Sequence, residues 1–387
     1  MSPLCNLVVV VKHLSNRTRK KGIPRSVPWS KPDIGSNERR AIGRVLRSGW
    51  LSQGKVTEDF EKELARTSNA RYAVVVNSGS SALLCALLAH GALQGDRVLV
   101  PDYTHVATAN VPALVRCKVF PVDADLRTLN VSESEIRRLV RKVRPKFVIC
   151  VDVAGMPNDL DLLSELADEF GFILIEDGAE ALGAEYKGRK VGSVANTATL
   201  SFHAAKLITT IEGGAVLTND THIAEQCRLI RNYGEAPDRK DAYTTVGTNL
   251  KITDVQSAIG IAQLRKLNKY VFRRNMIAER YREALSKWLE FQEIPEYVTR
   301  HPYMMFVTLA SSRRTRDMLR EHLIRNRIDT RTHFPPLHIR PKFRSACSKF
   351  PNSTYIFHHS LALPVHNAMR REEVELVISS VSDFFRG

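Results

Sequence analysis

Short runs of apolar residues recur along the first 220 positions and alternate with amphipathic segments. Such runs predict buried strands, which we expect at residues 72–76, 97–101, 119–122, 147–153, 172–175, 197–202 and 215–218. The segments around and between them predict helices at 37–47 with Ser36 as the N-cap, 56–67, 82–90, 132–143, 158–170 and 226–232. Repeated strand and helix units are typical of an α/β fold, with a mainly parallel sheet wrapped by helices on both faces.

The chain changes character after a long loop expected at 243–253. A helical stretch at 254–288, an apolar run at 304–309 and helices at 316–325 and 371–385 predict a small C-terminal α/β domain. We therefore expect a large domain over residues 23–255, and a linking helix with a small domain over 256–387. Residues 1–22 join a short apolar run to basic residues, which predicts a flexible N-terminal extension.

Composition places the chain among globular proteins, with 25% charged and 43% hydrophobic residues in a length of 387. No apolar run reaches the ~18 to 20 residues that span a bilayer, so we expect a cytoplasmic protein with no membrane partner. The six cysteines, at positions 5, 85, 117, 150, 227 and 347, contain no Cys-x-x-Cys pair. This spacing predicts reduced thiols, with neither a metal site nor a disulfide framework.

The charge balance is strongly basic, with 57 Lys and Arg against 41 Asp and Glu and a formal net charge of +16. Such a balance invites nucleic-acid binding, but the basic residues are spread along the chain and no helix-turn-helix, zinc-finger or aromatic-basic sheet motif gathers them. A positive field equally suits anionic small molecules. We therefore expect no nucleic-acid partner.

Two segments carry candidate chemistry. Lys206 lies between the apolar run at 197–202 and a turn that ends in two glycines; an amine desolvated there can form a Schiff base with an aldehyde, although a lysine that extends to water is the commoner case. Asp177 follows the buried run at 172–175, at the strand end where open α/β sheets bind ligands. A carboxylate for the ring nitrogen and a lysine for the aldehyde carbon are the two poles of a pyridoxal phosphate site.

A third segment, Gly79-Ser80-Ser81, joins the expected strand at 72–76 to the helix at 82–90. This arrangement points backbone N–H groups and the positive end of a helix dipole at an anion. Taken alone, it is also what ordinary helix capping looks like.

Residues 176–188 (EDGAEALGAEYKG) and 201–214 (SFHAAKLITTIEGG), with their spacing, resemble the sugar aminotransferases of the DegT/DnrJ/EryC1/StrS family. The resemblance extends from about residue 23 to the C-terminus. It implies fold type I, the aspartate aminotransferase-like fold, with pyridoxal 5'-phosphate as cofactor, Lys206 and Asp177 as catalytic residues, and a homodimer with composite active sites.

The same resemblance assigns the remaining cofactor contacts. Gly79, Ser80, Ser81 and Ser201 match positions that hold the cofactor phosphate, and His105 stands where relatives stack an aromatic ring on the pyridine. Glu180 replaces the more usual Gln that faces the ring hydroxyl and resembles the perosamine synthase branch. Asn249 matches an asparagine that reaches the phosphate in the neighbouring subunit, although an asparagine in a turn is the default without the family.

For the substrate side, the resemblance implies a nucleotide-linked keto sugar as acceptor and L-glutamate as amino donor. Lys251 and His338 are the candidate substrate contacts, with a structural role for His338 left equally open. On Glu180 we favour a 4-keto-6-deoxyhexose over a 3-keto sugar. Lys206 argues against the dehydratase branch, which has histidine there, and a non-catalytic cofactor-binding regulator is the alternative outside enzymes.

Overall fold

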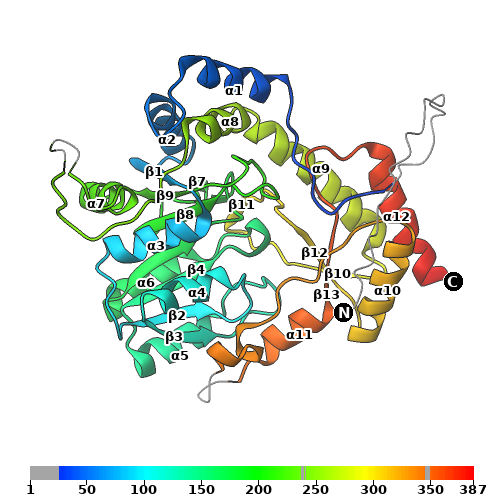
Figure 1. Ribbon diagram of the computed structural model, residues 1–387. Helices are drawn as coiled ribbons and strands as arrows, with labels where there is room; N and C mark the ends of the chain where they lie inside the picture. Colours follow the sequence, from blue (N-terminus) through cyan, green and yellow to red (C-terminus); the bar gives the residue numbers. More distant parts are fainter. Residues whose placement is uncertain (1–25, 237–238, 240, 345–348) are drawn as a thin grey trace, which may run out of the picture.

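The largest sheet has seven strands in the order β1-β9-β8-β5-β4-β2-β3 (Figure 1). The computed structural model describes residues 26–236, 239, 241–344 and 349–387, so the extension expected at 1–22 lies outside the described residues. β9 runs antiparallel to both of its neighbours, and all other neighbouring pairs are parallel. The strands are β1 (Tyr72–Val76), β2 (Arg97–Pro101), β3 (Lys118–Val122), β4 (Phe147–Val151), β5 (Ile173–Asp177), β8 (Thr197–Ser201) and β9 (Gly214–Thr218).

Helices cover both faces of this sheet, as the alternation of strands and helices predicts (Figure 1). In β1, Val74 and Val76 face one core with α3 and α7, whereas Ala73 and Val75 face another with α2 and the α8–α9 segment. This division follows from the two-residue period of a strand. The helices in this part of the chain are α1 (Ser36–Ser48), α2 (Lys55–Thr67), α3 (Gly79–Ala89), α4 (Ala107–Leu114), α5 (Glu133–Val143), α6 (Leu160–Phe170), α7 (Thr221–Arg231) and α8 (Asp254–Leu264). A short 3₁₀ helix, η1, spans Val153–Gly155.

The C-terminal part forms a second, smaller core around a three-stranded antiparallel sheet in the order β10-β12-β13. Another small sheet, β11-β6-β7, connects this part to the large one. The elements are α9 (Leu267–Leu285), β10 (Glu290–Phe291), β11 (Val298–Arg300), β12 (Phe306–Leu309), α10 (Arg313–Arg325), η2 (Leu337–Ile339), η3 (Pro341–Phe343), α11 (Pro351–His359), β13 (Ser360–Leu363) and α12 (Arg371–Arg386), with β6 (Glu185–Tyr186) and β7 (Arg189–Lys190) from the large part.

The change from the large to the small core falls inside α9. Tyr270 and Val271 pack in the core beneath β1 and β8, whereas Ile277 and Tyr281 pack in the C-terminal core. Val27 also belongs to the C-terminal core and pairs with Ile328. The expected domain boundary at residue 255 therefore stays a prediction. The packing passes from the large core to the small one further along the chain, within α9.

Two local predictions were wrong. The N-cap of α1 is Gly35 instead of Ser36, because the buried Glu38 carboxylate accepts a hydrogen bond from the Gly35 N–H at 2.7 Å. The stretch at 254–288 is two helices, α8 and α9, separated at Arg265 and Lys266. Lys266 forms an ion pair of 2.6 Å with Glu38 at this break, a contact that no local pattern encodes.

Two further findings bear on the composition. Cys85, Cys117, Cys150 and Cys227 are free and buried, as expected; positions 5 and 347 lie outside the described residues. Among the helices of the described residues, none is both long enough and apolar enough to cross a membrane.

Candidate active site

Asp177 ends β5 with its carboxylate buried, 5% exposed. The Thr108 hydroxyl donates to Oδ2 at 2.9 Å and the Ala179 N–H donates to Oδ1 at 3.3 Å. Burial raises the pKa of Asp177, and these two hydrogen bonds oppose that rise because they stabilise the charged form. Within the part of the chain that the structure describes, this buried carboxylate forms no ion pair.

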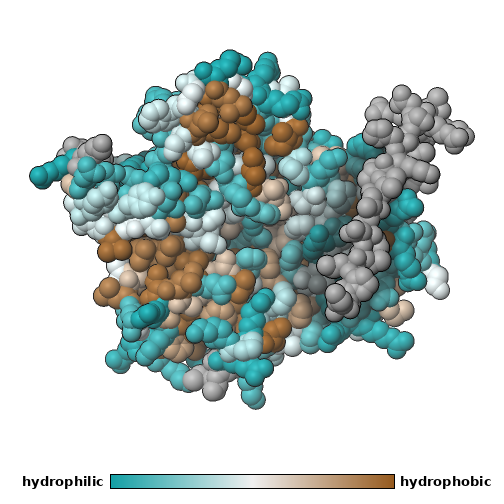
Figure 2. Space-filling view, viewed as in Figure 1, coloured by the Kyte–Doolittle hydropathy of each residue, from teal (hydrophilic) through white to brown (hydrophobic). Residues whose placement is uncertain are grey.

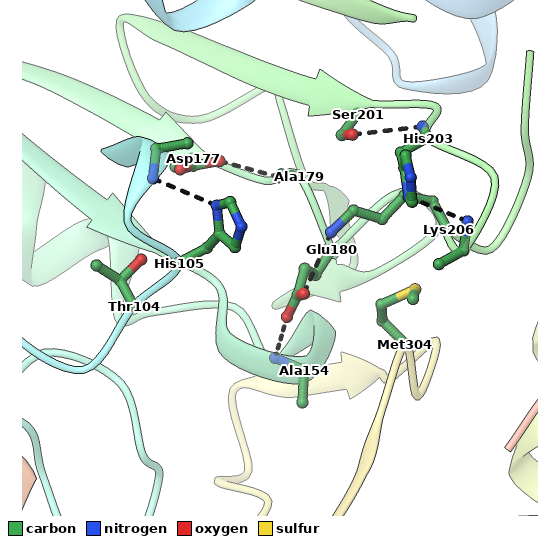
Figure 3. A network of polar contacts seen from close by, with 12 residues as sticks. Thr104, His105, Ala154, Asp177, Ala179, Glu180, Ser201, His203, Lys206 and Met304 are labelled. Atoms are coloured by element: carbon green, nitrogen blue, oxygen red, sulfur yellow. Dashed lines mark hydrogen bonds and ion pairs between the residues drawn. The ribbon is translucent and has the colours of Figure 1, made fainter. Parts of the chain in front are cut away.

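Lys206 lies in the loop after β8, and its amine points toward Glu180 (Figure 3). Lys206 Nζ is 3.2 Å from Glu180 Oε1, and both side chains are mostly buried. Glu180 Oε2 in turn accepts the backbone N–H of Ala154, in η1, at 2.9 Å. Both carboxylate oxygens of Glu180 therefore have donors, and they hold the lysine amine at a defined place.

His105 follows β2 and its ring extends into the space bordered by Asp177, Glu180 and Lys206 (Figure 3). Its Nδ1 accepts the Ala107 N–H at 3.3 Å. Burial lowers the pKa of His105, and the positive charge of Lys206 lowers it further. A neutral imidazole with an exposed face can stack on an aromatic ring, as expected for this residue.

Gly79, at the start of α3, touches the end of β8. A Cβ at Gly79 would lie 3.0 Å from Ser201 Cβ and 3.2 Å from its Oγ, so a side chain there would crowd Ser201. Ser78 caps α3 and accepts the Ser81 N–H at 3.1 Å. The helix start, the exposed Ser80 and Ser201 thus lie together and could hold a phosphate, while the Ser81 hydroxyl already donates to Asn77 at 2.6 Å.

Within the described part of the chain, His338 makes no hydrogen bond, ion pair or ring contact with Asp177, Lys206 or His105. Its Nδ1 lies 2.6 Å from Oδ2 of the buried Asp102, and its Nε2 lies 3.3 Å from the Thr354 hydroxyl. The ring stacks on Phe350 at a centroid distance of 5.0 Å. Both ring nitrogens are engaged, so the geometry favours the structural role over the substrate contact.

Asn249 and Lys251 lie in the irregular segment that crosses the end of β1. Asn249 is exposed and its Oδ1 accepts the Lys251 N–H at 3.2 Å. Lys251 Nζ donates to Asn232 Oδ1 at 2.7 Å and lies 4.5 Å above the Tyr233 ring centre. Among the described residues of the single chain, neither side chain forms a hydrogen bond or ion pair with Lys206 or Asp177.

The structure adds residues that sequence reasoning missed. Thr108 supports Asp177, the Ala154 peptide supports Glu180, and Met304 lies beside the Lys206–Glu180 pair (Figure 3). His333 also belongs here: burial lowers its pKa, and the charges of Glu180 and Lys206 act on its ring. These residues lack a sequence signal because their contacts are distant in the chain.

The arrangement fits pyridoxal phosphate. The buried Asp177 lacks the cation that a protonated ring nitrogen would supply, Lys206 would hold the aldehyde carbon, and the start of α3 with Ser201 would hold the phosphate. When bound, this cofactor supplies an electron sink for carbanion chemistry. Fold and site together define a fold type I pyridoxal phosphate enzyme of the aminotransferase class.

Comparison with known proteins places the chain more closely. Residues 32–382 match the DegT/DnrJ/EryC1/StrS aminotransferase family, and the chain belongs to that family. It is 32% identical over 360 residues to the GDP-perosamine synthase of Escherichia coli O157:H7, which covers 93% of this chain and 98% of that protein. The GDP-perosamine synthase of Vibrio cholerae is 32% identical over 366 residues, covering 93% of this chain and 99% of that protein.

One solved structure is similar to this chain in both fold and sequence. DesV of S. venezuelae, in complex with a ketimine intermediate, superposes with a TM-score of 0.85 and 31% identity, over 90% of this chain and 94% of that one. The protein is therefore a pyridoxal phosphate-dependent sugar aminotransferase.

Proposed function

We propose that this aminotransferase moves an amino group from L-glutamate to a nucleotide-linked 4-keto-6-deoxyhexose. The observation that carries the choice of a 4-keto sugar is Glu180, 3.2 Å from Lys206 Nζ, at the position where the perosamine synthase branch has glutamate. Two of the relatives with 32% identity are GDP-perosamine synthases, and their names support the same choice.

In this proposal each residue of the site has a task. Lys206 would hold the aldehyde group of the cofactor and, as a free amine, would move a proton at the substrate carbon, while Glu180 keeps this amine in place. Asp177 would hold the ring nitrogen of the cofactor. His105 would stack on the ring, and Gly79, Ser80, Ser81 and Ser201 would hold the phosphate. Donor and acceptor use one pocket in turn, so we expect ping-pong kinetics.

We further propose a homodimer with composite sites in which Asn249, and with it Lys251, serves the site of the neighbouring subunit. Asn249 is exposed in the single chain. Figure 2 shows apolar surface over α1 and α2, where Leu46, Trp50 and Leu51 are between 46% and 63% exposed, which supports burial against a second copy. The buried free thiols are those expected of a cytoplasmic enzyme.

The first test separates the two half-reactions. The visible absorption band of the bound cofactor is followed on adding L-glutamate, with Lys206→Ala as the control. The enzyme converted by glutamate is then offered GDP- and dTDP-linked 4-keto-6-deoxyhexoses and a 3-keto analogue, and the product is located by NMR. Restored absorbance with an amino group at C4 supports the proposal. Amination at C3 would replace it with the 3-keto alternative, and indifference to glutamate would overturn the donor.

A further inference from the structure

Arg274, in α9, is a buried arginine at the junction of the two cores, 2% exposed. Its Nε donates to Asn367 Oδ1 at 2.8 Å, and its Nη1 donates to the carbonyls of Tyr303 and Met304 at 2.9 and 3.0 Å. Among the described residues no carboxylate forms an ion pair with it. Burying a guanidinium on neutral acceptors alone carries a desolvation penalty, so the position calls for an explanation.

One series of hydrogen bonds leads from Arg274 to the loop that carries Lys206, called the lysine loop below. Asn367 accepts from Arg274 through Oδ1 and donates through Nδ2 to the Leu207 carbonyl at 2.8 Å. Leu207 is the residue directly after Lys206. The C-terminal segment thus holds the peptide next to the catalytic lysine, through an amide that uses both ends of its side chain.

A second series leads from Arg274 to the carboxylate that faces the same lysine. Arg274 binds the carbonyl of Met304, whose N–H donates to the Ala154 carbonyl at 2.9 Å. The N–H of Ala154 donates to Glu180 Oε2, and Glu180 Oε1 lies 3.2 Å from Lys206 Nζ. Figure 3 shows the links from Ala154 through Glu180 to Lys206, with Met304 beside the Lys206–Glu180 pair.

The two series of hydrogen bonds close a ring that starts and ends at Arg274. We propose that Arg274 is a positioning residue for the amino-transfer reaction, which sets the placement of the Lys206 amine relative to Glu180 from the junction of the two cores. Its fork of fixed N–H groups suits the task, because one planar group donates to three acceptors from two segments at once. The charge strengthens all of these hydrogen bonds in a buried setting.

The geometry explains why a neutral residue would not substitute. Without the guanidinium, the Met304 carbonyl and the Asn367 amide lose a buried donor, and the Lys206 loop and η1 can shift independently. A displacement near 1 Å at the reacting amine is enough to cost about 10²-fold in rate. The inference concerns the aminotransferase reaction itself and is independent of which keto sugar is accepted.

The test compares Arg274→Met with Arg316→Met. Arg316 is the control, because it is also buried, 4% exposed, and donates to the carbonyls of Phe357 and Ser360 within the C-terminal part; unlike Arg274, it also forms an ion pair with Asp317. We expect both variants to lose thermal stability. Only Arg274→Met lowers the single-turnover rate constant of the donor half-reaction, by about 10²-fold. The half-saturating glutamate concentration changes less than about threefold, and the pH midpoint of the cofactor absorption band moves. Arg274→Lys recovers part of the rate, since it retains a charged donor.

A second variant interrupts only the series of hydrogen bonds that runs through Asn367. Asn367→Asp gives Arg274 a carboxylate partner but cannot donate to the Leu207 carbonyl, so the protein keeps its fold while the lysine loop is released. In the cofactor-free proteins, amide hydrogen exchange of residues 203–210 is expected to be faster in Asn367→Asp and Arg274→Met than in the wild type and Arg316→Met. Equal exchange and an unchanged pH midpoint in Asn367→Asp would overturn the proposal, even if Arg274→Met failed to fold.

Discussion

Two hydrogen bonds to Asp177, from the Thr108 hydroxyl and the Ala179 N–H, favour its ionised form against the burial that raises its pKa. Thr108 lies 69 positions away along the chain. The sequence therefore indicated the carboxylate, from a polar residue that ends an apolar run, but not its partner. His105 shows the opposite case, since the family resemblance pointed to it before its surroundings were known.

At this scale we predict the effect of Thr108→Val. The valine keeps the shape but removes a donor that lowers the pKa of Asp177, so the pKa rises and the carboxylate is protonated at a higher pH. The acid limb of the kcat/KM profile moves to higher pH, with a loss of about 10-fold at pH ~6. Thr108→Ser, which retains the hydroxyl, is expected to follow the wild-type profile; coincident limbs for Val and Ser would contradict this role.

Neighbouring strands also bring buried charges together. Asp152 directly follows β4 and Glu176 lies in β5, and both are fully buried. Asp152 Oδ2 and Glu176 Oε1 have no donor among the described residues, whereas Glu176 Oε2 accepts the Gly192 N–H. Burial and the neighbouring charge raise the pKa of Glu176, and burial raises that of Asp152 to about 7. We infer that the two carboxyls share a proton, since each has one buried oxygen without a donor among the described residues.

This pair predicts how stability depends on pH. Because the folded pKa is raised, its contribution is full below the unfolded carboxyl pKa of ~4 and is lost as pH rises through about 7. Glu176→Gln supplies a permanent N–H donor to Asp152, so the fall in melting temperature between pH ~5 and ~8 becomes shallower. The change is measured by thermal unfolding across that range, with Glu185→Gln, on the partly exposed β6, as the control. Parallel curves for Glu176→Gln and the wild type would count against a shared proton.

At the scale of the whole molecule, each active site of the proposed homodimer takes Lys206 from one subunit and Asn249 from the other. Lys206→Ala and Asn249→Ala homodimers are then both impaired. A mixed dimer of the two variants has one site with both residues altered and one site with both intact. Subunit exchange in an equal mixture is expected to restore about one quarter of the wild-type activity. Activity that stays at the level of the separate variants would place Asn249 within its own subunit's site.

The seven strands, the helices on both sheet faces and the roles proposed for Lys206 and Asp177 follow from local patterns. Strand periodicity selects which side chains face each core, and a polar residue at the end of an apolar run marks the ligand-binding edge. Such signals lie within a few consecutive residues, which is why they can be seen without coordinates.

Contacts between distant segments needed the folded chain. The break between α8 and α9 lies beside the start of α1, where Glu38 and Lys266 form an ion pair although they are far apart in the sequence. The ring of hydrogen bonds through Arg274 likewise joins α9, the C-terminal loop and η1. Pairings of this kind are set by how the layers pack, because the same residue types would satisfy many other partners, and only packing brings these particular ones within hydrogen-bond distance.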